Sequence, residues 1–368
     1  MQRGVDVSVA TTDADGRGIL PVTLGELSEW RSIPVRFFPR ISSESYKFSP
    51  ALARWLEQAV GTFDIVHIHA IFCHSSVAAA RACIRQNIPY VLRPLGSLDS
   101  TTISRHSFRK KVFHYLWGKE MLRNSSAMHY STDRERLQVE VGFSTGKGFV
   151  LPPGIAHSTD YENKSRSKTT ARAPLPASPY VLFVGRLHPI KRLELLIDAF
   201  SQLPRTGEFR QWSLVIAGDG EPGYVETLKR HASSTVNSEK VFFCGWLNGA
   251  EKLEALADAE IFALTSRHEN FGLAAAEAMM MGVPVLVTED VFLADLIREC
   301  DTGWVAGRKS GELRDTLREA MLDPEARHRK GLAGRQVASS QFELGKTTRR
   351  LLEVYESIIA PGAGAHCH

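Results

Sequence analysis

Short apolar runs rich in β-branched residues alternate with helical patterns along most of the chain. The runs that predict strands lie at 5–11, 64–69, 90–94, 127–132, 180–185, 213–218, 241–246, 261–266 and 284–288. Helical patterns occupy intervals between them, for example at 74–86 and 105–124. This alternation is typical of parallel sheets covered by helices on both faces. The pattern therefore predicts an α/β protein with two doubly wound domains that face each other across a cleft.

A polar segment separates the two sets of strands. Residues 156–179 read AHSTDYENKSRSKTTARAPLPASP, a stretch rich in Ser, Thr, Pro and charge and poor in large apolar side chains. This composition is typical of a linker. We therefore expect an N-terminal domain at 1–155, a linker at 156–179, a C-terminal domain at 180–342 and a helix at 343–360 that returns to the N-terminal domain.

The composition is that of an ordinary globular protein. The chain has 368 residues, of which 43% are hydrophobic and 23% charged, with a net charge of +4. No apolar stretch approaches the roughly 18 residues that a membrane span needs, and no export signal is visible, so we expect a cytoplasmic protein. The five cysteines are scattered without close pairs, which argues against a disulfide framework or a zinc cluster.

Two carboxylates stand around the expected start of a helix in TSRHENFGLAAAEAMMMGVPVLV, namely Glu269 and Glu277. The loop before the helix follows a predicted strand, so it lies at the carboxyl edge of the sheet, where open α/β sheets bind ligands. The N–H groups near Phe271, Gly272 and Leu273 have no partners within the helix, and together with the helix dipole they predict an anion site.

A basic pair lies at the same expected edge. Arg186 and Lys191 belong to VGRLHPIKR, which follows the first strand of the second domain. Their charge would balance a phosphate and the two nearby carboxylates, while the carboxylates would accept hydrogen bonds from sugar hydroxyls. A phosphate-containing ligand with hydroxyl groups at both ends fits this arrangement, and a nucleotide sugar is such a molecule.

Four blocks in the second half resemble the donor domain of the family 4 retaining glycosyltransferases of GT-B fold. They are VGRLHPIKRLELLIDAF, VIAGDGE, FCGWL and SRHENFGLAAAEAMMMGVPVLV, in that order. In the first half, DIVHIHAIFCHSSVAAARACIRQNIPYVLRPLGSLD is similar to the acceptor domain of the bacterial surface-polysaccharide branch. The resemblance covers nearly the whole chain. It implies two Rossmann-like domains, an N-terminal one for the acceptor and a C-terminal one for the nucleotide-sugar donor.

The resemblance also implies roles for individual residues. Arg186 and Lys191 match the pair that grips the donor diphosphate, Glu277 matches the carboxylate that binds the ribose, and Glu269 matches the one that contacts the transferred sugar. His69 matches an acceptor-domain histidine that faces the reaction centre. The implied catalytic residues are His69, Arg186, Lys191 and Glu269. The implied donor-binding residues are Gly185, Arg186, Lys191, Trp246, Leu247, Glu269, Asn270, Phe271, Gly272, Leu273 and Glu277.

The implied activity is that of a retaining, metal-independent hexosyltransferase in polysaccharide biosynthesis. It would move a sugar from a nucleoside diphosphate sugar, UDP- or GDP-linked, to a glycan or lipid-linked glycan, without a further cofactor. Front-face attack, with the leaving phosphate helping to deprotonate the acceptor, is implied for such enzymes. A noncatalytic nucleotide-sugar-binding homologue is the alternative. A two-carboxylate glycosidase would leave the phosphate-binding groups without a purpose. A dinucleotide-dependent oxidoreductase would need a G-x-G-x-x-G motif directly after a first strand, with an acidic residue about 20 positions further on, and no such arrangement follows a first strand here.

Two further features are open to more than one interpretation. His67 and His69 lie on one strand face and with His74 could be taken for a metal site, but one of the pair is equally explained as a core histidine. The basic and aromatic stretch 104–124 fits a membrane-surface helix at the inner face of the plasma membrane, or a helix whose apolar face packs on its own domain. No known nucleic-acid-binding pattern accompanies the charge.

The N-terminus departs from the family pattern. MQRGVDVSVATTDADGRG resembles the end of a first helix followed by the second strand, so the first strand and its Gly–Gly loop are missing from this sequence. Because that strand is normally central, we expect either that the sequence is a truncated reading of a longer chain or that the product is poorly stable and weakly active.

Overall fold

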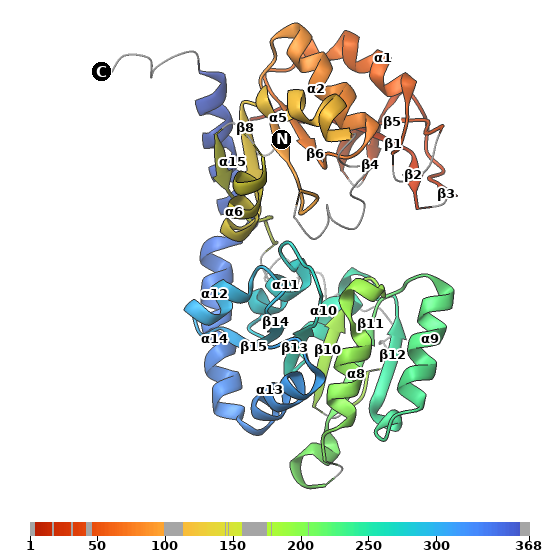
Figure 1. The fold of residues 1–368 in the computed structure, drawn as a ribbon, viewed down its shortest axis with the longest axis vertical. Helices are drawn as coiled ribbons and strands as arrows, with labels where there is room; N and C mark the ends of the chain where they lie inside the picture. The colour runs from red at the N-terminus through yellow and green to blue at the C-terminus, as the bar shows by residue number, and fades with distance from the viewer. Residues whose placement is uncertain are drawn as a thin grey trace, which may run out of the picture. The chain divides into compact units, whose positions relative to one another are not determined.

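The computed structural model describes residues 4–360 apart from 17, 31, 42–45, 99–112, 144, 146, 157–174, 178 and 205. The chain divides into two compact units, one made of Met1–Leu151 with Leu351–His368 and one of Pro152–Arg350 (Figure 1). We call them the N-terminal and C-terminal units. Most of the expected linker at 156–179, and residues 104–112 of the expected helix at 104–124, lie outside the described residues.

The C-terminal unit contains one parallel six-stranded sheet in the order β12-β11-β10-β13-β14-β15. Its strands are β10 (Tyr180–Val184), β11 (Ser213–Ala217), β12 (Val241–Gly245), β13 (Ile261–Leu264), β14 (Val285–Thr288) and β15 (Gly303–Ala306). From β10 the chain builds the sheet outward in one direction, and at β13 it returns to β10 and builds in the other. The point where the direction reverses therefore lies between β10 and β13, which is where such sheets bind ligands.

Helices cover this sheet. They are α8 (Leu193–Ser201), α9 (Pro222–Ser233), α10 (Gly249–Ala257), α11 (Leu273–Met281), α12 (Ala294–Glu299), α13 (Ser310–Leu322) and α14 (Pro324–Gln341). Helix α8 packs against α13, and α11 packs against α14. Because helices cover the sheet, its strands carry near-continuous apolar runs, and Phe183 and Phe262 are fully buried. The predicted α/β fold with doubly wound, Rossmann-like halves is confirmed.

The N-terminal unit holds two main sheets. The first has the order β1-β5-β4 and the second is parallel with the order β6-β7-β8-β9. Their strands are β1 (Val9–Thr12), β4 (Leu27–Trp30), β5 (Ile33–Phe38), β6 (Val66–His69), β7 (Tyr90–Arg93), β8 (Ala127–Tyr130) and β9 (Gly148–Val150). Strands β2 (Ala14–Asp15) and β3 (Gly18–Ile19) form a small antiparallel pair. No strand within the described ranges hydrogen-bonds both β1 and β6, so the two sheets remain separate. The expected truncation of the chain stays a prediction.

Helices complete the N-terminal unit. They are α1 (Pro50–Ala59), α2 (His74–Gln86), α5 (Lys119–Arg123), α6 (Asp133–Gly142) and the latter part of α15 (Leu344–Ile359), and a π-helical turn at His114–Gly118 precedes α5. Helix α1 packs against α2, and Leu52, Val77, Leu92 and Met128 belong to one buried cluster. None of the helices in the described ranges is both long enough and apolar enough to cross a membrane.

Candidate functional site

The chain after β10 hydrogen-bonds to the chain at the end of β11, and two glycines there permit the close approach. Gly185 N–H donates to the Ala217 carbonyl at 3.0 Å, and Leu187 N–H donates to the Asp219 carbonyl at 2.8 Å. A β-carbon at Gly218 would lie 1.8 Å from the Gly185 oxygen, and one at Gly220 would lie 2.1 Å from the Leu187 oxygen. Only glycine at these two positions permits this approach of the loops. The sequence alone predicted no role for these two glycines, which belong to the block VIAGDGE.

Lys191 is brought to Glu269 by hydrogen bonds between the loops after β10 and β13. The Thr265 hydroxyl donates to the Lys191 carbonyl at 2.9 Å. In the same region, Arg267 N–H donates to the Ile190 carbonyl at 2.8 Å. The Lys191 ammonium forms an ion pair with the Glu269 carboxylate, and the two side chains are only 19% and 20% exposed. The structure therefore places these two predicted site residues together at the switch point of the sheet.

The start of α11 provides unpaired backbone donors beside Glu269. Gly272 adopts the left-handed conformation (φ 85°) immediately before the helix, and no side chain caps the helix start. The first turn contains no acidic residue, so its N–H groups and positive dipole end are available to an anion. Phe271 is buried and packs edge-on against Phe342 at 5.2 Å between ring centroids. Only the backbone of Phe271 is therefore available to a ligand. Leu273, the first helical residue, is half exposed.

Glu277 lies one turn further along α11 and is paired with a residue that sequence reasoning missed. The Lys252 ammonium of α10 lies 2.8 Å from Glu277 Oε1, and both side chains are largely buried. Nothing in the spacing of the sequence connects Lys252 to Glu277, because they belong to separate helices. Each predicted carboxylate thus has its own lysine.

Asp290 and Arg308 form a second missed group that holds the Glu269 backbone. Glu269 N–H donates to the Asp290 carbonyl at 3.3 Å, and the Glu269 carbonyl accepts from Phe292 N–H at 2.9 Å. The Arg308 guanidinium holds both Asp290 carboxylate oxygens at 2.8–3.1 Å. The loops after β14 and β15 therefore fix the loop that carries Glu269.

The remaining predicted donor-side residues differ in their surroundings. Arg186 is exposed and makes no hydrogen bond or ion pair with another described residue. The Asn270 side-chain oxygen is buried without a hydrogen-bond partner among the described residues. After β12, Trp246 is 76% exposed, while the next residue, Leu247, is buried. The indole and the guanidinium are therefore accessible to a ligand.

His69 belongs to the N-terminal unit. It is the last residue of β6 and is exposed. Partial burial and the charge of Arg93 lower the pKa of His69. His67, two residues earlier, is instead engaged on both ring nitrogens, by the Tyr355 hydroxyl and by His129. His67 is therefore the core histidine of the pair, and His69 is the accessible one. No group of three His, Cys, Asp or Glu residues in the described ranges could hold a metal ion.

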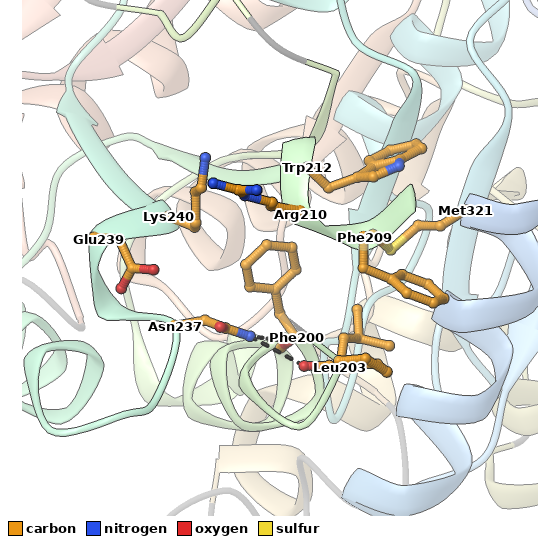
Figure 2. Close-up of a pocket in the computed structure, with 10 residues that line it drawn as sticks. Phe200, Leu203, Phe209, Arg210, Trp212, Asn237, Glu239, Lys240 and Met321 are labelled. Atoms are coloured by element: carbon orange, nitrogen blue, oxygen red, sulfur yellow. Dashed lines mark hydrogen bonds between the residues drawn. The ribbon is translucent and has the colours of Figure 1, made fainter. Parts of the chain in front are cut away.

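A cavity of about 390 Å³ lies at the opposite edge of the C-terminal sheet (Figure 2). Its lining comes from residues next to the starts of β11 and β12, including Trp212 and Lys240, and from the end of α8, including Phe200. Asn237 closes one side by donating to the carbonyls of Phe200 and Leu203 at 3.4 and 3.3 Å. Since ligands of parallel sheets bind at the carboxyl edge, this cavity is separate from the candidate site.

Comparison with known proteins agrees with this geometry. Residues 167–337 match the family of glycosyl transferases group 1, and residues 1–154 match the glycosyl transferase 4-like domain. The D-inositol 3-phosphate glycosyltransferase of Nocardia farcinica is 28% identical over 84% of this chain and 69% of its own length. The glycogen synthase of Mycobacterium tuberculosis is 30% identical over 56% of this chain and 50% of its own.

Solved structures share the fold. Sucrose-phosphate synthase from Thermosynechococcus elongatus aligns over 98% of this chain and 91% of its own, with a TM-score of 0.74 and 18% identity. Anabaena HepE, solved in complex with UDP and glucose, aligns over 89% of this chain and 87% of its own, with a TM-score of 0.68 and 20% identity.

Proposed function

We propose that this chain, which belongs to the group 1 glycosyltransferases of GT-B fold, transfers a sugar from a UDP- or GDP-linked donor to a glycan or lipid-linked acceptor with retention of anomeric configuration. The observation that carries the proposal is the meeting of Lys191, Glu269 and the uncapped start of α11 at the switch point of one sheet. A diphosphate needs cations and backbone donors, and its sugar needs a hydrogen-bond acceptor for its hydroxyls. This edge supplies all three.

In the proposed reaction, the acceptor oxygen forms a bond to the anomeric carbon while the bond from that carbon to the diphosphate oxygen breaks. The bonding electrons leave with the diphosphate, and the acceptor proton passes to the leaving phosphate on the same face of the sugar. Arg186, Lys191 and the N–H groups at the start of α11 stabilise the charge that builds on the phosphate. The ion pair with Glu269 holds Lys191, and the helix holds the N–H groups, so these groups need little reorganisation during bond cleavage.

The two glutamates have separate roles in this proposal. Glu269 accepts hydrogen bonds from the transferred sugar, and its ion pair with Lys191 couples the sugar position to the diphosphate position. Glu277 accepts hydrogen bonds from the ribose, and Lys252 holds it in position. Trp246 and Leu247 directly follow β12, the edge strand of the same sheet, and their backbone groups would hold the base. No metal ion is assigned a step.

The acceptor is proposed to bind in the N-terminal unit, at the carboxyl end of β6 that carries His69. The relatives carry the names of transferases to a cyclitol phosphate and to glycogen, and for this chain we propose a role in polysaccharide biosynthesis in the cytoplasm. Contact with the inner face of the plasma membrane through 104–124 stays a prediction.

The experiment that tests the donor assignment is a thermal-shift panel of UDP-, GDP- and ADP-sugars. A ligand at 100 times its Kd stabilises the folded state by about 2.7 kcal/mol, so one nucleotide should stand out from the others. Release of nucleoside diphosphate with and without added glycan then separates an enzyme from a noncatalytic binding homologue. Absence of stabilisation by every nucleotide sugar would contradict the proposal.

A further inference from the structure

One face of the β6-β7-β8-β9 sheet carries an arginine among three histidines. His69 and Arg93 are register partners at the carboxyl ends of β6 and β7. The rings of His67 and His69 lie 4.5 Å apart, and those of His67 and His129 lie 5.2 Å apart. Burial, and to a smaller extent the charge of Arg93, lowers the pKa values of all three histidines. Arg93 is therefore the cation of this cluster.

The hydrogen bonds of the cluster occupy every ring nitrogen of His67 and His129. Neither imidazole is therefore left to accept a hydrogen bond from Arg93. The Leu151 carbonyl can only accept, so His129 Nε2 must donate to it at 2.7 Å. In neutral His129, Nδ1 is then an acceptor and receives the His67 Nε2–H at 3.3 Å. His67 Nδ1 in turn accepts from the Tyr355 hydroxyl of α15. The chain is complete with both imidazoles neutral.

The nearest buried carboxylate is also engaged elsewhere. Glu135 is 2% exposed and accepts from Gly96 N–H at 2.6 Å and from Ser131 N–H at 2.7 Å. Arg93 donates only to the Ser131 hydroxyl, at a long 3.4 Å, and its Nε is buried without an acceptor among the described residues. Burial lowers the pKa of Arg93 and the charge of Glu135 acts against this shift, but a half-buried guanidinium with one long hydrogen bond still has donors that a further anion would satisfy.

Two residues at this edge have a left-handed backbone conformation. Ala70, directly after His69, has φ 66°, and Leu95, two residues after Arg93, has φ 53°. Such values are unfavourable for residues with a side chain and cluster at binding sites. Leu95 is also half exposed. Carboxyl ends of parallel strands are the usual place for ligands.

We propose that Arg93, together with His69 and Ser131, binds a phosphate group carried by the acceptor substrate. That the phosphate belongs to an acceptor substrate rests on the proposed function. The anion site itself is inferred from the contacts of Arg93 alone. Phosphate suits the site because guanidinium, imidazole and hydroxyl donors share one edge and a phosphate presents three oxygens. The phosphate belongs either to a soluble sugar phosphate or to a lipid headgroup.

The test compares Arg93→Gln with the wild-type chain and with Arg85→Gln, an exposed arginine of the same unit paired with Glu57. Inorganic phosphate is titrated in saturating UDP, which occupies the proposed donor site, and again in the Lys191→Ala background. We expect Arg93→Gln to weaken phosphate binding roughly 10- to 100-fold, the size of a lost charged hydrogen bond. Arg85→Gln should leave it unchanged, and UDP affinity should be unchanged in both. Arg93→Lys keeps the charge and should fall between wild type and Arg93→Gln.

Further arms identify the source of the phosphate. Glucose 6-phosphate is compared with glucose and glucuronate, and phosphatidylcholine vesicles are compared with and without phosphatidic acid. Arg93-dependent binding of either phosphate ligand supports the proposal and names its source. Phosphate binding that is equal in wild type and Arg93→Gln, or Arg93-dependent binding of glucuronate but not of glucose 6-phosphate, would overturn it. Failure of the wild-type chain to bind UDP would instead count against the donor assignment. Failure of the phosphate site and failure of the proposed function are therefore distinguishable.

Discussion

The charged side chains at the carboxyl edges of the sheets are paired differently in the two units. In the C-terminal unit, both glutamates at the carboxyl edge of the sheet have lysine partners, Lys191 for Glu269 and Lys252 for Glu277. In the N-terminal unit, the carboxyl edge of β7 presents Arg93, which has no carboxylate bonded to it among the described residues. Each glutamate at one edge has its own lysine, whereas the arginine at the other edge has no bonded carboxylate among the described residues.

This difference indicates what each edge is prepared for. Lysines hold both glutamates, and the Asp290–Arg308 pair also holds the loop of Glu269, so the proposed donor side is organised before a ligand binds. On the other side, two imidazoles complete a neutral chain to Tyr355 and leave Arg93 to an external anion. A preformed site and a site that awaits a charge should respond differently to mutation and to pH.

The largest effect is expected from removing a cation at the proposed donor edge. Lys191→Ala should reduce turnover roughly 10²- to 10³-fold, because one stabilising group at a developing anion contributes about 2.7–4 kcal/mol. Arg186→Ala should act in the same direction. Steady-state release of nucleoside diphosphate measures the effect, and Lys229→Ala on α9 serves as the control. Near-normal turnover in both site variants would refute the phosphate assignment.

Acid should destabilise the N-terminal unit selectively. The pKa of His67 is lowered to about 2 and that of His129 to about 3, from the ordinary 6.5, mainly by burial. The unfolded chain therefore binds more protons than the folded one below pH 6.5, and stability falls as the pH decreases. Between pH 7 and 5.5 the two imidazoles together should cost about 2–3 kcal/mol.

Hydrogen exchange read peptide by peptide measures this effect in each unit. Protection of β6 and β8 should decrease at pH 5.5 more than that of β10 and β13, after correction for the intrinsic exchange rate. Equal decreases in both units would show that the histidine chain is not the cause.

A methyl group at Gly218 should disturb the proposed donor edge through steric overlap, without removing any charged group. Gly218→Ala places a carbon within 1.8 Å of the Gly185 oxygen at a left-handed φ of 138°, and such overpacking costs about 1–3 kcal/mol. Chemical denaturation and UDP affinity should both report the change. Gly223→Ala is the matched control, because nothing lies within 4 Å of its added carbon. If Gly218→Ala behaves like this control, the close approach of the two loops is wrong.

The smallest effect separates the two carboxylates. Glu277→Ala should weaken binding of bare nucleoside diphosphate about 10-fold, the loss of one charged hydrogen bond, because the ribose is common to nucleotide and donor. Glu269→Ala should weaken the sugar-bearing donor more than the bare nucleotide. Calorimetric titration of both ligands measures this, and identical losses of nucleoside diphosphate affinity in the two variants would contradict the separate roles.

The sequence by itself determined the elements and the edge at which they place polar groups. Runs such as YVLFVG and IFALTS predict buried strands from side-chain pattern alone, and they correspond to β10 and β13. Gly272 precedes helix α11 at the predicted start, and Gly282 follows its last residue, because helix ends depend on a few neighbouring residues. The division of the N-terminal strands into two sheets could not be predicted this way, because strand pairing joins distant segments.

Only the tertiary structure decided which of these groups meet. Lys191 and Glu269 are 78 positions apart, and they form an ion pair because β10 and β13 are neighbours in the sheet. Tertiary packing likewise produces the Lys252–Glu277 pair and the contact that requires glycine at position 218. It also joins His67 to Tyr355, which is 288 positions away. Local pattern sets where a strand begins and ends, whereas strand order and helix packing follow from burying apolar faces of the whole chain at once.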